Sequence, residues 1–163
     1  MTAAVRIEPA VEEDVPLILS LITALADYER LAHEVVATEA MVRESLFGPS
    51  PHAHASIARV SGEAAGFAIW FPTYSTFLSK PGIYLEDLFV LPVWRGQGIG
   101  RALLSHLARI AVDRGCGRIE WSVLDWNETA IRFYRSLGAR PMDEWTVFRL
   151  TGDAIQRLAI NDL

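Results

Sequence analysis

The sequence predicts an α/β fold in which helices flank a mixed central β-sheet. Residues 83–91 and 118–124 are apolar, strand-like runs joined by a helical stretch, which favours a right-handed crossover between two parallel strands. Residues 55–60 and 64–71 are β-rich runs joined by a short turn, which is typical of an antiparallel hairpin. Parallel and antiparallel neighbours together predict one mixed sheet.

Periodicity and capping signals place the other elements. Leu17, Leu21 and Leu25 recur at helical spacing, and Thr38 offers a hydroxyl N-cap for a second helix. In chain order, strands and helices are expected at residues 4–8, 17–30, 38–47, 55–60, 64–71, 83–91, 99–114, 118–124, 129–137 and 145–150.

Three residues are expected to interrupt or end these elements. Pro72 has no amide hydrogen, so it is expected to end or bulge the second hairpin strand. Gly115 is expected to cap the long central helix in a left-handed conformation, and Gly138 to stop the helix at 129–137.

Composition predicts a single domain over residues 1–163. The chain is 51% hydrophobic and 21% charged, which is enough apolar surface to offset the chain entropy lost on folding. Its formal net charge of −5 argues against a nucleic-acid partner, and it weakly favours a cationic substrate such as an amine. An anionic ligand therefore needs a local cationic pocket.

The single cysteine, Cys116, excludes an internal disulfide and is expected to be a buried, inert thiol. The four histidines show no zinc-ligand spacing, so no metal is predicted; they are His33, His52, His54 and His106. No apolar run approaches the roughly 20 residues that span a bilayer, and the first ten residues do not resemble a signal peptide. A cytoplasmic protein without a membrane partner is expected.

A glycine-rich stretch, Val-Trp-Arg-Gly-Gln-Gly-Ile-Gly at residues 93–100, lies between a predicted strand and a predicted helix. Its glycines permit positive φ and close approach of bare backbone, while the helix start directs unpaired N–H groups at a ligand. Arg95 and Arg101 add local cations, so pyrophosphate is the expected ligand.

Two other phosphate-binding motifs do not fit. A P-loop needs Lys and Ser or Thr after its last glycine, but Arg101 and Ala102 follow here. A dinucleotide fingerprint needs glycine where Leu103 or Arg101 stands. On spacing alone, a glycine-rich turn with no ligand stays an open alternative.

At these residues the sequence resembles the GNAT acetyltransferases, whose acetyl-CoA motif Arg/Gln-Xaa-Xaa-Gly-Xaa-Gly/Ala is met by Arg95, Gly98 and Gly100. Over residues 6–150 it is similar to the diamine (spermidine/spermine) acetyltransferase subfamily, through Tyr-Leu-Glu-Asp-Leu-Phe-Val at 84–90, Asp-Trp-Asn-Glu at 125–128, and the residues at 133–139. The resemblance implies the GNAT fold and a homodimer. It also implies direct transfer of acetyl from acetyl-CoA to the primary amine of a small molecule.

Within the subfamily, residues 73–76 and 123–127 resemble the branch that acts on thialysine and related lysine analogues. The polyamine branch usually carries an acidic residue where Ser75 stands. Without that carboxylate an anchor for a second ammonium is missing, so an amine with a different distal group is favoured.

The resemblance also implies roles for individual residues. Glu86 matches the general base, Tyr134 the general acid, and Tyr28 and Glu29 the site that, with Glu86, recognises the amine. The cofactor-binding positions are Leu88, Phe89 and Val90 for the acetyl-pantetheine arm, Arg95, Gly96, Gln97, Gly98, Ile99, Gly100 and Arg101 for the pyrophosphate, and Asn127 for either.

Acetyl transfer requires a base that removes a proton from the ammonium and an acid that protonates, or donates a hydrogen bond to, the departing sulfur. A lysine-like ammonium has a pKa of about 10.4, so roughly one molecule in a thousand is neutral at pH 7, and Glu86 is expected to accept the proton through water. Tyrosine has a pKa about 1.5 units above that of a thiol, so full transfer from Tyr134 to sulfur is uphill by roughly 2 kcal/mol. A hydrogen bond from Tyr134 to sulfur is sufficient.

Each site residue also has a structural interpretation. Glu86 and Asp87 fit a solvated strand end or an ion pair, Tyr134 fits an aromatic packed on the sheet, and Asn127 fits a helix N-cap. Tyr28 and Glu29 fit the end of an amphipathic helix. Two other functions also remain open, a protein or peptide N-acetyltransferase and a CoA-binding regulatory module without turnover.

Overall fold

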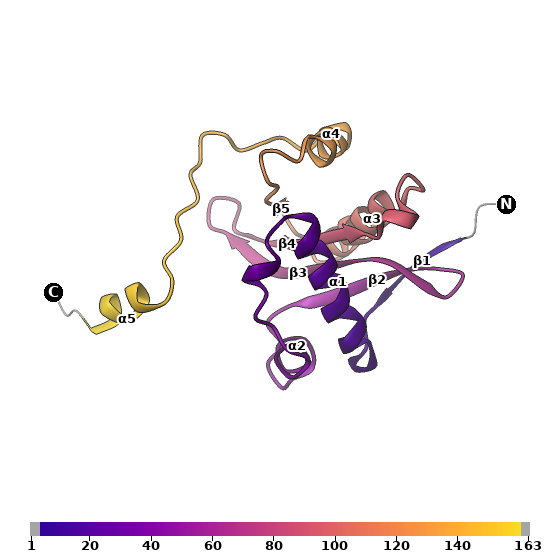
Figure 1. The fold of residues 1–163 in the computed structure, drawn as a ribbon. Helices are drawn as coiled ribbons and strands as arrows, with labels where there is room; N and C mark the ends of the chain where they lie inside the picture. Colours follow the sequence, from indigo (N-terminus) through magenta and orange to yellow (C-terminus); the bar gives the residue numbers. More distant parts are fainter. Residues whose placement is uncertain (1–3, 161–163) are drawn as a thin grey trace. The chain divides into compact units, whose positions relative to one another are not determined.

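The computed structural model describes residues 4–160, and the chain divides into two compact units, residues 1–124 and 125–163 (Figure 1). The elements of the first unit are β1 (Val5–Pro9), η1 (Glu12–Asp14), α1 (Val15–Tyr28), η2 (Ala32–Glu34), α2 (Glu39–Phe47), β2 (His54–Val60), β3 (Glu63–Ser75), β4 (Lys80–Val90), η3 (Pro92–Trp94), α3 (Ile99–Asp113) and β5 (Ile119–Trp121). The second unit contains α4 (Glu128–Ser136) and α5 (Asp153–Ile160).

The five strands form one mixed sheet in the order β1-β2-β3-β4-β5. The first three pairings are antiparallel, and β4 pairs with β5 in parallel across the α3 crossover. This confirms the mixed sheet and the strand–helix–strand unit that the sequence predicts. It also leaves β5 as one edge of the sheet, beside the strand that carries the candidate site.

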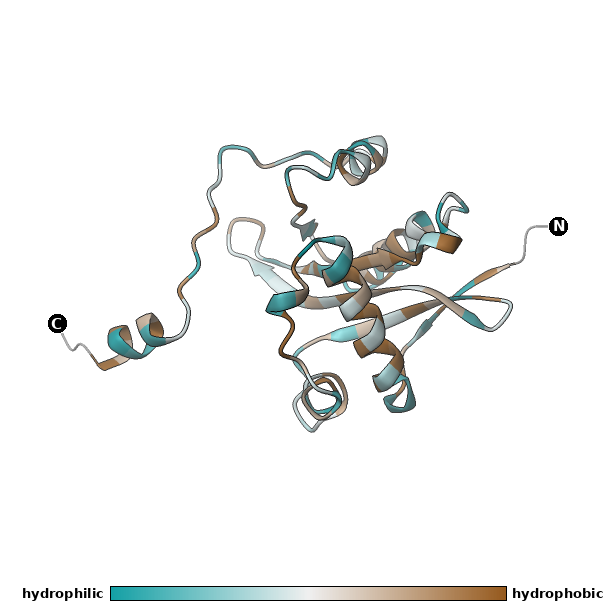
Figure 2. Ribbon diagram, in the orientation of Figure 1, coloured by the Kyte–Doolittle hydropathy of each residue, from teal (hydrophilic) through white to brown (hydrophobic). Residues whose placement is uncertain are grey.

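One hydrophobic cluster lies between the sheet and α1, and α3 buries a further set of apolar side chains, which includes Ile99, Leu103 and Leu107. The apolar face of α1 packs on side chains of β2, β3 and β4 at less than 10% exposure; the cluster includes Val15, Ile18, Leu21, Leu25, Ile57, Phe67, Ile69 and Phe89. Burying each large aliphatic side chain contributes about 1.5–3 kcal/mol. Figure 2 shows much of α1 and the central strands in the brown of hydrophobic residues. This packing fixes the end of α1 beside the end of β4.

The hairpin turn forms as predicted. Ser61 and Gly62 both have positive φ, 51° and 87°, as a tight two-residue hairpin connection requires. The prediction that Pro72 ends or bulges the second strand is wrong, because β3 continues to Ser75 and Pro72 pairs with Ile83. Pairing of β2 with β3 stops at Trp70, so β3 is an edge strand at Pro72 and its missing amide hydrogen costs no ladder bond.

Helix capping also follows the sequence. The Thr38 hydroxyl accepts a hydrogen bond from the Met41 amide at the start of α2. Gly115, with φ of 65°, follows α3 in the left-handed conformation, as predicted. Among residues 4–160, no helix is both long enough and apolar enough to cross a bilayer.

In the second unit, α4 forms as predicted and Gly138, with φ of 89°, follows it. The strand predicted at residues 145–150 is wrong, since no strand is assigned there and Trp145, Val147 and Phe148 are 74%, 83% and 92% exposed. A strand needs a neighbour for its main-chain N–H and C=O groups, and residues 145–150 have no strand partner in the described chain. Helix α5 was not predicted.

Candidate active site

The far end of β4 has an open edge. Pairing with β5 stops at Leu85 and Trp121, whereas β4 continues to Val90. Residues 86–90 therefore have a strand neighbour only on the β3 side in the described chain. The two parallel strands therefore stop pairing before β4 ends, and the main-chain groups of this stretch are available to an extended ligand, which can bond to them as an added strand does. Leu88, Phe89 and Val90 all lie on this open stretch.

Glu86 is the extra residue of a β-bulge. In the register of β3 and β4, Ile69 lies opposite Asp87 and Trp70 lies opposite Leu85, which leaves Glu86 without an opposite residue. Bulges are frequent next to active sites because they redirect a side chain. The Glu86 side chain is exposed, and it forms no ion pair with residues 4–160. It is thus free to meet an ammonium.

Two more carboxylates, Asp87 and Glu29, lie near the end of β4, and Asp87 is within electrostatic reach of both Glu86 and Glu29. Burial and, to a smaller extent, the charges of Glu86 and Glu29 together raise the pKa of Asp87 to about 6. Burial also raises the pKa of Glu29, at the C-cap of α1. Asp87, whose ionisation is opposed by the charges of two neighbouring carboxylates, favours a cation beside it. Sequence reasoning treated Asp87 as structural only, because nothing in the pattern shows that β4 and the end of α1 meet.

Tyr28, Phe89 and Arg95 form a cluster at the same end of the sheet. The Tyr28 and Phe89 ring centroids are 6.2 Å apart, and the Arg95 guanidinium carbon lies 4.6 Å and 5.4 Å from them, respectively. The Arg95 Nε–H donates to the Val90 carbonyl at 2.9 Å. The structure therefore joins a residue assigned to the amine, Tyr28, with three residues assigned to the cofactor.

The glycine-rich turn has the geometry that a phosphate group requires. Gly96 and Gly98 have φ of 77° and 79°, and an added Cβ at either would meet nothing within 4 Å, so the turn is open. Ala102 is the first α3 residue whose amide bonds back, to the Gly98 carbonyl. The preceding amides of α3, from Ile99 to Arg101, are therefore available to an acceptor, and the helix dipole favours an anion there. The turn thus fits the pyrophosphate of acetyl-CoA.

The other two predicted site residues lie in the 125–163 unit. The Asn127 side chain accepts a hydrogen bond from the Ala130 amide at 3.3 Å, so its interpretation as the N-cap of α4 is confirmed. Tyr134 lies in α4 with its ring 5.4 Å from that of Phe133. Neither observation tests a role in catalysis.

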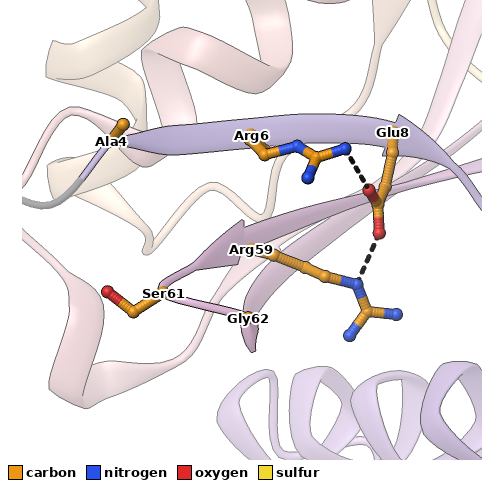
Figure 3. A pocket seen from close by; sticks show the side chains of 6 residues that line it. All are labelled: Ala4, Arg6, Glu8, Arg59, Ser61 and Gly62. Atoms are coloured by element: carbon orange, nitrogen blue, oxygen red, sulfur yellow. Dashed lines mark hydrogen bonds and ion pairs between the residues drawn. The ribbon is translucent and has the colours of Figure 1, made fainter.

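One cavity, of about 290 Å³, lies at the β1–β2 edge (Figure 3). Arg6 and Arg59 line it, and both bind Glu8, at 3.5 Å and 2.6 Å. Arg59 also binds Asp14 at 2.7 Å. Because the protein's own carboxylates compensate these cations, the cavity is poorly suited to an anionic ligand.

A second cavity, of about 560 Å³, is lined by His54 and His106. His54 stacks on Trp70 at 4.4 Å, and His106 Nε2 lies 3.2 Å from the Ser56 hydroxyl, which agrees with a packing role for both. Burial lowers the pKa of each histidine, with a further contribution from a nearby arginine. In the described part of the chain no three His, Cys, Asp or Glu side chains gather as metal ligands would.

Comparison with known proteins gives consistent matches. The profile of the acetyltransferase (GNAT) family matches residues 22–139. Thialysine N-epsilon-acetyltransferase from Sus scrofa is 39% identical, with 96% of this chain and 98% of that protein aligned. L-ornithine N5-acetyltransferase from Arabidopsis thaliana is 34% identical, over 94% of this chain and 87% of the relative.

A solved structure agrees as well. An integron cassette protein from the mobile metagenome of V. cholerae superposes with a TM-score of 0.80 at 27% identity, over 96% of this chain and 98% of that one. The family profile and both relatives extend across the boundary between the two units. This protein is therefore an N-acetyltransferase and belongs to the acetyltransferase (GNAT) family.

Proposed function

We propose that the protein transfers an acetyl group from acetyl-CoA to a primary amine of a small molecule, with thialysine, other lysine analogues and ornithine-like diamines as the acceptor class. The observation that carries this proposal is the open end of β4, where the bulged carboxylate of Glu86 is followed within ten residues by an anion-binding turn. The names of the relatives, which act on thialysine and ornithine, support the choice of acceptor.

Acetyl-CoA supplies an activated acetyl thioester. In the proposal, main-chain groups of Leu88, Phe89 and Val90 hold its pantetheine arm along the open edge of β4. Asn127 contributes a further contact to the arm or the pyrophosphate. The pyrophosphate is bound by the turn residues and the first turn of α3, that is by Arg95, Gly96, Gln97, Gly98, Ile99, Gly100 and Arg101.

Glu86 accepts a proton from the acceptor ammonium through a water molecule, which leaves the nitrogen a lone pair for direct attack on the acetyl carbonyl. As the C–N bond forms and the C–S bond breaks, Tyr134 donates a hydrogen bond or a proton to the departing thiolate. The nitrogen releases its second proton, which returns to Tyr134 or passes to water, so the products are the amide and the free thiol. The main-chain amide near Val90 stabilises the negative charge that develops on the carbonyl oxygen. No acyl-enzyme is required.

Acidic groups select the amine. Tyr28 and Glu29, at the end of α1, with Glu86 and Asp87 on β4, provide ring faces and negative charge for the acceptor. The Ser75 hydroxyl is buried and accepts a hydrogen bond from the Leu78 amide at 3.2 Å. A serine used in this turn is not an anchor for a second ammonium, which supports a lysine analogue over spermidine.

An acceptor panel tests the proposal. Thialysine, lysine, ornithine, diamines, spermidine and peptides are each mixed with acetyl-CoA, and release of free thiol is followed. The expected order places thialysine or ornithine first. Preference for peptides would instead support a protein N-acetyltransferase. Stabilisation by CoA without acetylation of any amine would identify a regulatory module.

We also propose that the two units act as one domain over residues 1–163 and that the protein is a homodimer. The resemblance to the diamine acetyltransferase subfamily is what supports the dimer. Light scattering is expected to give a dimer mass for the intact protein. A monomeric wild-type protein would refute the dimer. The cytoplasmic location and the absence of a nucleic-acid partner stay predictions from composition.

A further inference from the structure

The side chain of Arg95 connects the two proposed substrate sites. We propose that Arg95 is a positioning residue that couples them: in the ligand-free protein its guanidinium covers Tyr28 and the Val90 carbonyl, and a pyrophosphate at the glycine turn draws it away. This inference rests on the proposed function, and it assigns Arg95 a second task beyond holding the cofactor.

Within residues 4–160, the side chain of Arg95 contacts three neutral groups. Its Nε–H donates to the Val90 carbonyl at 2.9 Å, and its guanidinium carbon lies 4.6 Å from the Tyr28 ring centroid and 5.4 Å from that of Phe89. No carboxylate among residues 4–160 forms an ion pair with it. The cation is thus held by one carbonyl dipole and two ring faces, and at an exposed position such contacts are individually weak.

These contacts obstruct both proposed substrates. The Val90 carbonyl belongs to the stretch of β4 proposed for the pantetheine arm, and one of its acceptor positions is taken by Arg95. The Tyr28 ring face, proposed for the acceptor cation, is covered by another cation. An acceptor ammonium must therefore compete with Arg95 in the ligand-free protein.

A pyrophosphate offers Arg95 a stronger partner. Arg95 directly precedes Gly96, the first of two glycines with positive φ in the turn, so its backbone adjoins the phosphate site. Charge-assisted bonds from guanidinium to phosphate are roughly twice as strong as bonds between neutral groups. Cofactor binding is therefore expected to free the Tyr28 ring and to raise the affinity for the amine. By linkage, the amine raises the affinity for the cofactor by the same factor.

Calorimetry measures this coupling. Thialysine is titrated into the protein with and without saturating CoA, a product that prevents turnover, for wild type, Arg95→Gln, Arg95→Lys and Arg101→Gln. Arg101 is the matched control, since it is an exposed arginine on the first turn of α3 and, within the part of the chain that the structure describes, it does not lie over the Tyr28 or Phe89 ring.

In wild type, CoA is expected to tighten thialysine binding about tenfold, the worth of two exposed cation–π contacts. Arg101→Gln is expected to need more CoA for saturation but to keep the tenfold ratio. Arg95→Gln is expected to bind thialysine without CoA as tightly as wild type does with CoA. The ratio of its thialysine affinities with and without CoA therefore falls to about one. Arg95→Lys, which restores the cation, is expected to recover part of the ratio.

A ratio in Arg95→Gln equal to that of wild type would overturn the inference, as would a wild-type ratio of one. Neither result would affect the proposed function if CoA binds. Failure of wild type to bind millimolar CoA, or thialysine in either state, would instead overturn the proposed function. An independent readout is the NMR signal of the Arg95 Nε–H, which is expected to lose its ring-current shift when CoA is added; an unchanged signal contradicts the movement.

Discussion

Two arginines of the 1–124 unit occupy opposite electrostatic settings. Arg59, with 25% of its side chain exposed, lies between the carboxylates of Glu8 and Asp14 at 2.6 Å and 2.7 Å, so its charge is compensated within the protein. Arg95 has ring faces and a carbonyl as partners, while Glu86 and Asp87 at the end of β4 form no ion pair with any residue from 4 to 160. The first cluster holds β1 to β2 and to the start of α1. The second cluster, at the end of β4, leaves its charges available to charged ligands.

The comparison suggests a general criterion for this fold. A cluster whose charges cancel adds stability and needs no partner, whereas a cluster that leaves like charges together raises the free energy of the folded state. Protein sites for ligands commonly accept that cost. The following experiments, from the largest expected effect to the smallest, separate the two clusters.

Replacing Glu86 with Gln is expected to lower kcat about 1000-fold at pH 7, because the acceptor ammonium then loses the carboxylate that accepts its proton. The loss is expected to shrink as the pH approaches the pKa of the free amine, where the nitrogen is already neutral. The matched control is Glu8→Gln, which alters a carboxylate of the compensated cluster. If both variants lose the same activity, or if the Glu86→Gln loss is constant with pH, Glu86 is not the base.

Replacing Asp87 with Asn is expected to stabilise the protein by up to about 3 kcal/mol at pH 8. The folded-state pKa is about 6 against an ordinary value of 3.8, so the ionised carboxylate is disfavoured in the folded state. Wild-type stability is therefore expected to fall as the pH rises from about 4 to 6, and to stay lowered above 6. Urea melts at pH 4 and pH 8 measure the difference, which should disappear at pH 4. A gain of the same size at both pH values would show that charge is not its cause.

Tyr134→Phe extends the comparison to the second unit. We expect kcat to fall about 30-fold, because loss of one hydrogen bond to a departing thiolate costs less than loss of full proton transfer. Binding of acetyl-CoA is expected to change little, since the role concerns only the transition state. Steady-state and binding measurements together decide the point, and an unchanged kcat would remove Tyr134 from the mechanism.

Exchanging each arginine for Gln tests the two settings directly. Arg59→Gln is expected to lower the free energy of unfolding by about 1–2 kcal/mol, because Glu8 and Asp14 lose their compensating charge. Arg95→Gln is expected to change it by less than about 0.5 kcal/mol, because its contacts are exposed. Chemical denaturation of both variants provides the values. Equal losses would remove the distinction on which the comparison rests.

Much of the fold was predictable because its signals are local. Thr38 caps α2, Ser61 and Gly62 form the hairpin turn, and Gly115 follows α3, each with the predicted conformation. The strand predicted at 145–150 failed because strand formation depends on a neighbour that local composition does not supply. The prediction that Pro72 ends or bulges the strand failed because pairing with β2 stops before Pro72. This leaves an unpaired edge of β3, on which proline is tolerated.

Part of the candidate site could be predicted from the sequence, and part could not. The residues in the glycine-rich turn were recognisable because three glycines and an arginine within six positions restrict what the backbone can do. The cluster of Tyr28, Phe89 and Arg95 joins three separate segments, and no spacing in the sequence indicates that a guanidinium lies on both rings. Asp87 was likewise undervalued, because its pKa depends on burial and on a carboxylate from α1.

The sequence by itself determined the order of elements in the first unit, their turns and caps, and the residues of the turn, because these depend on neighbours along the chain and on the steric limits of each residue. Only the tertiary structure decided that Glu86 is the bulged residue, that β4 extends beyond its pairing with β5, and that the Arg95 guanidinium lies over two aromatic rings. Strand register and side-chain packing are settled between segments distant in sequence, where many pairings share one local pattern.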